Sequence, residues 1–246
     1  MSSRTTKVAI VTGASRGIGK AIALRLANDG FAVTIGYAGA CAQAQATVAE
    51  IEGLGGKAIA IKADVSNAAD VTELFRTTHL TFGRLDVVVS NAGVMELAPI
   101  SVENIDAFDR MMAINVRGTF LVMAKAVEML GPGGRIVALS TSVIAKSTPG
   151  YGPYIASKSA VEGLVRVLAN ETRGRHITVN AIAPGPTATE LFLKGKTQQQ
   201  IETLTTLSPL ERLGDTTDVA NVVSFLVGKE GGWINAQIVR CNGGFA

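Results

Sequence analysis

Short apolar segments alternate along the chain with longer segments in which apolar residues recur at helical spacing. Seven segments rich in β-branched residues are expected to be strands, at 7–12, 31–37, 57–65, 85–90, 134–140, 177–184 and 236–242. Their near-continuous apolar character is typical of strands buried on both faces of a parallel sheet. The segments between them predict helices over 17–29, 41–53, 67–82, 101–130, 151–173 and 215–228.

This alternation predicts an α/β fold, a Rossmann-type doubly wound parallel sheet of about seven strands with helices on both faces. No repeat, low-complexity tract or linker divides the 246 residues, so we expect a single domain over 1–246. The segment 185–214 breaks the rhythm, because it is long, polar in its middle and interrupted by Pro186 and Pro209. Such an insertion is typical of a lid over a binding site, and we expect a substrate lid there.

Composition and charge argue against several classes of function, namely nucleic-acid binding, membrane association and metal binding. The net charge of +3 comes from interspersed acids and bases, so the charge pattern does not indicate nucleic-acid or membrane-surface binding. No apolar run approaches the ~20 residues that span a bilayer. Cys41 and Cys241 form no paired motif, which favours a reduced, cytoplasmic location. His79 and His176 lack ligand-like spacing, so no metal site is expected.

Three glycines stand where the first strand is expected to meet the first helix, in "VTGASRGIGKAIALRLANDG" (11–30). Gly13 would end the strand, where ligands of open parallel sheets bind. Gly17 and Gly19 would open the helix, whose free N–H groups favour an anion. The turn, which includes Ser15 and Ile18, therefore predicts a cradle for the pyrophosphate of a dinucleotide. A tight strand–helix turn without a ligand is the alternative.

The end of the second expected strand bears on the cofactor. An acidic residue there would bind the ribose 2′-hydroxyl of NAD, whereas this chain has Tyr37 followed by Ala38, Gly39 and Ala40. No carboxylate at that position repels a 2′-phosphate, and Arg16 can reach the phosphate with a charge-assisted hydrogen bond. The sequence therefore predicts NADP(H). The alternatives are that Arg16 is a solvated loop residue and that the protein is an NAD-linked alcohol dehydrogenase.

Tyr154 and Lys158, in "YGPYIASKSAVEGL" (151–164), are four residues apart in an expected helix and so share one of its faces. A phenol ordinarily has a pKa near ~10, and a neighbouring ammonium lowers that pKa. The pair is therefore a candidate proton donor or acceptor for the interconversion of a carbonyl and an alcohol. A surface pair without a catalytic role is the alternative reading of this spacing.

Together, "TGASRGIG" (12–19), "NAG" (91–93), Asn115 in "INVRGTF", "YIASK" (154–158) and "PGPTAT" (184–189) resemble the classical short-chain dehydrogenase/reductase family. The motifs occur in order and cover nearly the whole chain. The resemblance implies hydride transfer between a nicotinamide and a carbonyl carbon. Tyr154 would exchange a proton with the substrate oxygen, Lys158 would lower its pKa and hold the ribose, and Asn115 would anchor a proton-relay water.

The same resemblance implies the remaining site residues. Asn91, Ala92 and Gly93 would line the adenosine side, and Asp64 and Val65 would contact the adenine. Pro184, Gly185, Thr187 and Thr189 would hold the nicotinamide carboxamide.

One catalytic position is ambiguous, because family members usually carry a serine 13 residues before the tyrosine. That offset falls on Thr141 here, whereas the "SV" at 142–143 resembles the family's usual "SSVAG". We expect Ser142 to be the catalytic hydroxyl and Ser140 to be a wall of the nicotinamide pocket. Thr141 remains an alternative.

Within the family, "SPLERLG" (208–214) and the C-terminal "NGG" most resemble bacterial 3-oxoacyl-carrier-protein reductases and trihydroxynaphthalene reductase-like members. We therefore predict an NADPH-dependent carbonyl reductase that acts on a small 3-oxoacyl-type or other hydrophobic carbonyl substrate. An apolar pocket lining is expected from Met95, Leu97, Ile144, Leu191, Phe192 and Leu193. A nucleotide-sensing protein without catalysis is the alternative from another class.

We also expect a homotetramer, or a dimer through the same helices. The expected helices at 101–130 and 151–173 carry apolar residues on more than one face, and only one face can cover the sheet. These residues are Met111, Met112, Phe120, Val122, Val161, Leu164, Val165 and Leu168.

Overall fold

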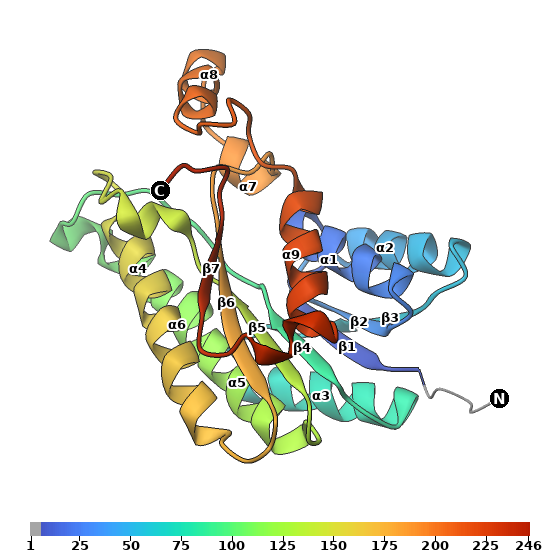
Figure 1. The fold of residues 1–246 in the computed structure, drawn as a ribbon. Helices are drawn as coiled ribbons and strands as arrows, with labels where there is room; N and C mark the ends of the chain where they lie inside the picture. The colour runs from blue at the N-terminus through green and yellow to red at the C-terminus, as the bar shows by residue number, and fades with distance from the viewer. Residues whose placement is uncertain (1–5) are drawn as a thin grey trace.

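Seven parallel strands form one sheet in the computed structural model, which describes residues 6–246 (Figure 1). The strand order is β3-β2-β1-β4-β5-β6-β7. The strands are β1 (Val8–Thr12), β2 (Ala32–Tyr37), β3 (Lys57–Lys62), β4 (Val87–Ser90), β5 (Arg135–Leu139), β6 (Thr178–Pro184) and β7 (Ile238–Cys241). The predicted doubly wound α/β fold is therefore confirmed, with the order reversing between β1 and β4.

Helices cover both faces of the sheet. One layer contains α1 (Gly17–Asn28), α2 (Cys41–Gly53) and α9 (Thr216–Val227), and the other contains α3 (Ala68–Phe82), α5 (Gly118–Met129) and α6 (Gly152–Glu171) (Figure 1). Successive residues of β1 point into opposite layers, because side chains alternate along a strand. Ile10 packs under α3 and α5, whereas Val11 packs under α1 and α9, and both are fully buried. This explains why the strands read as continuous apolar runs.

Two expected elements differ from the structure. The helix predicted over 101–130 is broken into η1 (Val102–Asn104), α4 (Ile105–Met111), the π-helical turn η2 (Met112–Arg117) and α5. A π turn holds an extra residue per turn, which the apolar periodicity does not reveal. The strand predicted over 57–65 ends at Lys62, because its partner strand β2 ends opposite it at Tyr37.

The loops that follow the strands gather at the carboxyl edge of the sheet. They include η3 (Ser142–Ala145), α7 (Glu190–Leu193) and α8 (Gln198–Thr206), whereas η4 (Glu230–Trp233) precedes β7. The helices α7 and α8 both belong to the segment 185–214, and they project beyond this edge (Figure 1). In open α/β sheets, ligands bind at this edge, where the strand order reverses.

Fewer apolar side chains are exposed in the segments 101–130 and 151–173 than we expected from the sequence. Met111, Val122, Val161 and Val165 are each at most 1% exposed, so the chain buries them itself. Phe120 on α5 is 55% exposed and Val167 on α6 is 57% exposed. Among the described residues, no helix is both long and apolar enough to cross a membrane.

Candidate active site

The glycine turn joins β1 to α1 in a conformation that side chains would block. Gly13 and Gly17 have φ angles of 64° and 56°, in the left-handed region that favours glycine. A Cβ on Gly19 would lie 2.3 Å from the carbonyl oxygen of Gly13 and 2.5 Å from the Asn91 amide nitrogen. All three predicted glycines are therefore required by the geometry, and the backbone is left open toward the crevice.

Hydrogen bonds hold the end of β4 against the end of β1. The Asn91 side-chain amide donates to the carbonyl oxygens of Thr12 at 2.8 Å and Gly13 at 3.1 Å. In return, the Thr12 hydroxyl accepts hydrogen bonds from the backbone N–H groups of Asn91 and Ala92, both at 3.0 Å. These four bonds hold the glycine turn against the strand that begins the second half of the sheet. "NAG" is thus placed beside the turn, as the resemblance implies.

A single pocket of about 1270 Å³ runs along this edge. Nineteen of the predicted residues line it. They are Gly13, Ser15, Arg16, Gly17, Ile18, Gly19, Tyr37, Asp64, Val65, Asn91, Ala92, Gly93, Ser140, Tyr154, Lys158, Pro184, Gly185, Thr187 and Thr189. Most of these residues follow the ends of six different strands, and Tyr154 and Lys158 come from α6.

The cofactor end of the pocket fits a dinucleotide. No side chain caps the N-terminus of α1, and its first turn contains no acidic residue, so its N–H groups remain available to a pyrophosphate. Around the end of β2 the lining is small and uncharged, from Ala38 to Ala42, and the Tyr37 hydroxyl donates to the Cys41 sulfur at 3.3 Å. This region therefore places no carboxylate beside a ribose 2′-substituent.

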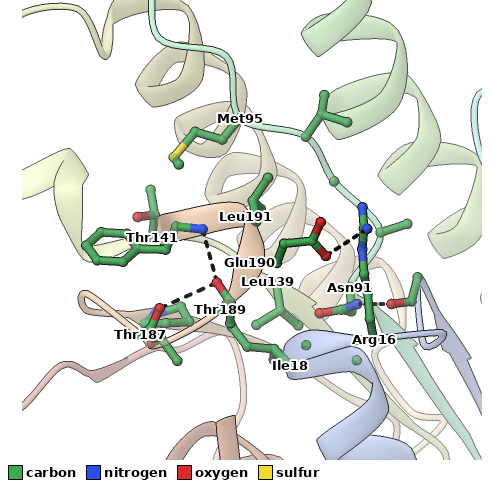
Figure 2. A pocket seen from close by; sticks show the side chains of 18 of the residues that line it. Arg16, Ile18, Asn91, Met95, Leu139, Thr141, Thr187, Thr189, Glu190 and Leu191 are labelled. Atoms are coloured by element: carbon green, nitrogen blue, oxygen red, sulfur yellow. Dashed lines mark hydrogen bonds and ion pairs between the residues drawn. The ribbon is translucent and has the colours of Figure 1, made fainter. Parts of the chain in front are cut away.

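Arg16 has a partner that the sequence did not indicate. Its Nη1 lies 2.9 Å from Oε2 of Glu190, at the start of α7, and both side chains are mostly exposed (Figure 2). Exposed ion pairs contribute at most about 1 kcal/mol, so this contact leaves Arg16 able to turn to a stronger anion. It also connects the glycine turn with the segment 185–214.

The reactive end of the pocket contains Tyr154, Thr141 and Lys158. Burial raises the pKa of Tyr154 to about 12, a hydrogen bond with Thr141 opposes this rise, and Tyr151 adds to it. Burial also lowers the pKa of Lys158 to about 8, and its Nζ donates to the Leu139 carbonyl at 2.8 Å. We expected the ammonium to lower the tyrosine pKa, but Nζ is 5.9 Å from the Tyr154 ring centre and desolvation dominates. The phenol therefore stays protonated at neutral pH.

Asn115 lies behind the pocket wall, in the π-helical turn η2, and is fully buried. Its amide oxygen accepts the backbone N–H of Val94, and its nitrogen donates to the Val94 carbonyl and to the Ser157 hydroxyl. A Cβ on Gly93 would lie 3.2 Å from this amide oxygen and 3.3 Å from Lys158 Nζ. Asn115 thus ties the loop after β4 to α6 beside Lys158. Both N–H donors of its amide are used in this way.

Ser142, which we expected to be the catalytic hydroxyl, lies outside the pocket. Ser142 is 2% exposed, donates to the Ala183 carbonyl at 2.7 Å, accepts from Asn242 at 3.0 Å and does not line the pocket. Thr141, one residue earlier, lines the pocket (Figure 2), and a hydrogen bond with Thr141 lowers the pKa of Tyr154. Successive side chains after β5 point to opposite sides, so a shift of one residue decides which hydroxyl faces the phenol.

Ser140 lines the pocket as expected, but not through its hydroxyl. The hydroxyl donates to Oε1 of Glu162 on α6 at 2.7 Å. Ser140 is therefore a wall residue whose polar group is already used within the protein.

The substrate side of the pocket is partly as predicted. Met95 and Leu191 line it (Figure 2), and so does Phe192, whereas Leu97, Ile144 and Leu193 do not. Lys146, Thr148, Tyr151, Leu204 and Leu207 also line it, and Phe245 is a lining residue that the sequence did not indicate. Phe245 comes from the C-terminal tail, and no local pattern in the sequence indicates that it returns to this edge.

Comparisons with known proteins agree with this geometry. The family model described as enoyl-(acyl carrier protein) reductase matches residues 13–246. A short-chain type dehydrogenase/reductase of Picea abies is 45% identical over 97% of this chain and 92% of that protein. An NADPH-dependent aldehyde reductase-like protein, chloroplastic, of Arabidopsis thaliana is 40% identical over 97% of this chain and 94% of that protein. A crystal structure of a short chain dehydrogenase from Burkholderia cenocepacia in complex with NADP superposes with a TM-score of 0.92, at 37% identity and 99% coverage of both chains.

The Gly19 contact generates a prediction about the cradle. We expect Gly19→Ala to weaken binding of NADPH at least about tenfold, because its methyl group would push the Gly13 carbonyl and Asn91 apart. Gly163→Ala is the matched control, since Gly163 is in the exposed face of α6 and has no atom within 4 Å of its Cβ position. NADPH fluorescence titration measures both, and equal affinities for the two variants would contradict the prediction.

Proposed function

Because the chain belongs to the classical short-chain dehydrogenase/reductase family, we propose that it is an NADPH-dependent reductase of hydrophobic aldehydes and ketones. That it is an NAD(P)-dependent oxidoreductase follows from the family and from relatives that are named as reductases. The observation that carries the proposal is that the Tyr154–Thr141 pair lines the same pocket as the glycine turn. A nucleotide sensor would not need this pair.

NADP(H) is the cofactor. Relatives named NADPH-dependent and structures in complex with NADP or NADPH bear out this prediction. In this chain the uncharged end of β2 and the single guanidinium of Arg16 are suited to a 2′-phosphate. The pyrophosphate would lie on the glycine turn at the N-terminus of α1.

NADPH, when bound, supplies the hydride that reduces the carbonyl carbon. Tyr154 would donate its proton to the carbonyl oxygen, because a phenol with a pKa of about 12 is protonated at neutral pH and can act as an acid. The Thr141 hydroxyl would orient the phenol and the same oxygen. The Lys158 ammonium would hold the ribose and stabilise the negative charge that Tyr154 develops, and Asn115 would support this group from behind the wall.

The substrate side favours a small hydrophobic carbonyl compound, either 3-oxoacyl-type or of another kind. Met95, Leu191 and Phe192 give the pocket apolar walls from two separate segments. The segment 185–214 would act as the lid, since α7 and the end of α8 contribute to the lining. An acidic carrier protein would need free basic residues, and Arg175 instead donates to the carbonyls of Val127 and Leu130. We therefore favour a free substrate. We also propose a cytoplasmic location, since Cys41 and Cys241 are free cysteines.

The first experiment tests the catalytic role of Tyr154. We expect Tyr154→Phe to lose turnover at least about a hundredfold, because it removes only the proton donor. Affinity for NADPH should change little, since the ring and the cradle remain. Ketone- and aldehyde-dependent oxidation of NADPH measures the first quantity, and NADPH fluorescence measures the second. Near-normal turnover in this variant would contradict the proposed mechanism.

A second prediction separates the two neighbouring hydroxyls. Thr141→Val should lower kcat at least about tenfold, with Thr141→Ser restoring most of it, because the hydroxyl faces the phenol. Ser142→Ala should instead lower the free energy of unfolding by about 1–3 kcal/mol, since buried hydrogen bonds to Ala183 and Asn242 are lost. Steady-state kinetics and urea unfolding measure the two effects. A kcat loss confined to the Ser142 variant would refute the assignment of Thr141.

A third prediction concerns the choice of cofactor. Arg16→Ala should weaken NADPH binding by about ten- to a hundredfold and change NADH binding by less than about threefold, because only the 2′-phosphate bonds to the guanidinium. Arg25→Ala, which removes an exposed guanidinium from the far end of α1, is the control. Affinities for both cofactors, measured by fluorescence, decide the question. Equal losses of affinity for NADPH and NADH would show that Arg16 does not bind the 2′-phosphate.

The proposed assembly is a homotetramer. Phe120 and Val167 are more than half exposed on the neighbouring helices α5 and α6, and Trp233 before β7 is 99% exposed. Burial of these surfaces between copies of the chain would remove apolar area from water. We expect light scattering at micromolar concentration to give four times the 25.5 kDa chain mass. A monomeric mass would refute the proposal.

A further inference from the structure

The C-terminal tail forms part of the pocket wall and is held in place from two sides. The Asn242 amide donates to the Ser142 hydroxyl at 3.0 Å and to the terminal Ala246 oxygen at 2.7 Å. On the other side, the Ser208 hydroxyl donates to the Gly243 carbonyl at 2.6 Å. The tail therefore bridges the segment after β5 and the end of the lid segment (Figure 1). Phe245, at its end, is 7% exposed and lines the pocket.

An ammonium group is held over this ring. The Nζ of Lys146, in the turn after η3, lies 5.1 Å from the centre of the Phe245 ring, within the range of a cation–π contact. Both residues line the pocket, and the apolar Leu204 and Leu207 line it too. Since the tail fixes the ring, the contact also restrains where the ammonium can lie.

The charge of Lys146 is not compensated within the described chain. Among the ion pairs of residues 6–246, none includes Lys146. The acidic residues that line the pocket in this range are Asp64, which accepts two hydrogen bonds from Ser66, and Glu190, which pairs with Arg16. Lys158 is also bonded, to Leu139. Lys146 is thus the lining cation that has neither a carboxylate nor a carbonyl partner in the described structure.

We infer that Lys146, positioned on Phe245, binds a carboxylate on the substrate, so that the enzyme prefers hydrophobic aldehydes and ketones that carry an acid group remote from the carbonyl. Lys146 is an exposed residue, and a charge-assisted hydrogen bond between an ammonium and a carboxylate is stronger than one between neutral groups. The apolar side chains around it would contact the body of the substrate while the carbonyl lies at Tyr154. This inference rests on the proposed reductase function.

Matched substrates test the inference. The probes are 4-formylbenzoate and its methyl ester, which differ in charge at one end, and the ω-oxo derivatives of butanoic, hexanoic and octanoic acid, which vary the span. The wild-type enzyme should favour the acid over the ester in kcat/KM. Lys146→Met keeps an apolar stem on Phe245 but removes the charge. It should reduce the ratio of kcat/KM for acid to ester at least about tenfold, and Lys146→Arg should retain most of that ratio.

Lys229→Met is the control for general electrostatic attraction, since Lys229 is an exposed lysine just before η4 and does not line the pocket. It should leave the acid-to-ester ratio unchanged. An equal loss for acid and ester in Lys146→Met would mean that the lysine only supports the tail, and would overturn the inference. No preference of the wild type for any of the acids would overturn it too. If the wild-type enzyme reduced neither the acids nor the ester, the proposed reductase function itself would be refuted.

Discussion

The close approach of β1 and β4 is the constraint on which the site depends. The two strands are neighbours at the point where the sheet order reverses, and their ends must meet without side chains between them. Glycine at 13 and 19 removes the Cβ atoms, and the Asn91 amide fills the remaining gap with hydrogen bonds to Thr12 and Gly13. The N-terminus of α1 consequently faces the crevice with its N–H groups free. A pyrophosphate can approach this backbone closely, which a larger residue would prevent.

Desolvation sets the protonation states in the reactive group. It acts in opposite directions on the two side chains, because burial disfavours whichever form is charged. The pKa of Tyr154 rises and that of Lys158 falls, and the hydrogen bond from Thr141 opposes the rise only in part. A protonated phenol is suited to give a proton to a carbonyl oxygen. The same burial therefore acts on both side chains of the reactive group, and it keeps the proton on the phenol at neutral pH.

The two ends of the pocket are built in different ways. The cofactor end is made of backbone and short side chains at the ends of strands, where the sheet allows little movement. The substrate end is made of side chains from the turn after η3, the lid segment and the C-terminal tail, joined by Ser142, Ser208 and Asn242. Ser142 thus holds the C-terminal tail through its bond with Asn242. The groups that would hold the cofactor are therefore separate from the side chains that form the substrate wall.

The sequence by itself determined the parallel sheet, the glycine turn and the Tyr154–Lys158 pair, because each depends on local spacing. Apolar runs identify strands buried on both faces, and a four-residue interval places two side chains on one helical face. Tertiary structure alone decided that the hydroxyl interacting with the Tyr154 phenol belongs to Thr141 rather than Ser142. It also decided that Arg16 forms an ion pair with Glu190 and that the Lys146 ammonium lies over the Phe245 ring. These contacts join segments far apart in the chain or depend on a shift of one residue. Periodicity cannot register them, because they are set by how whole elements pack.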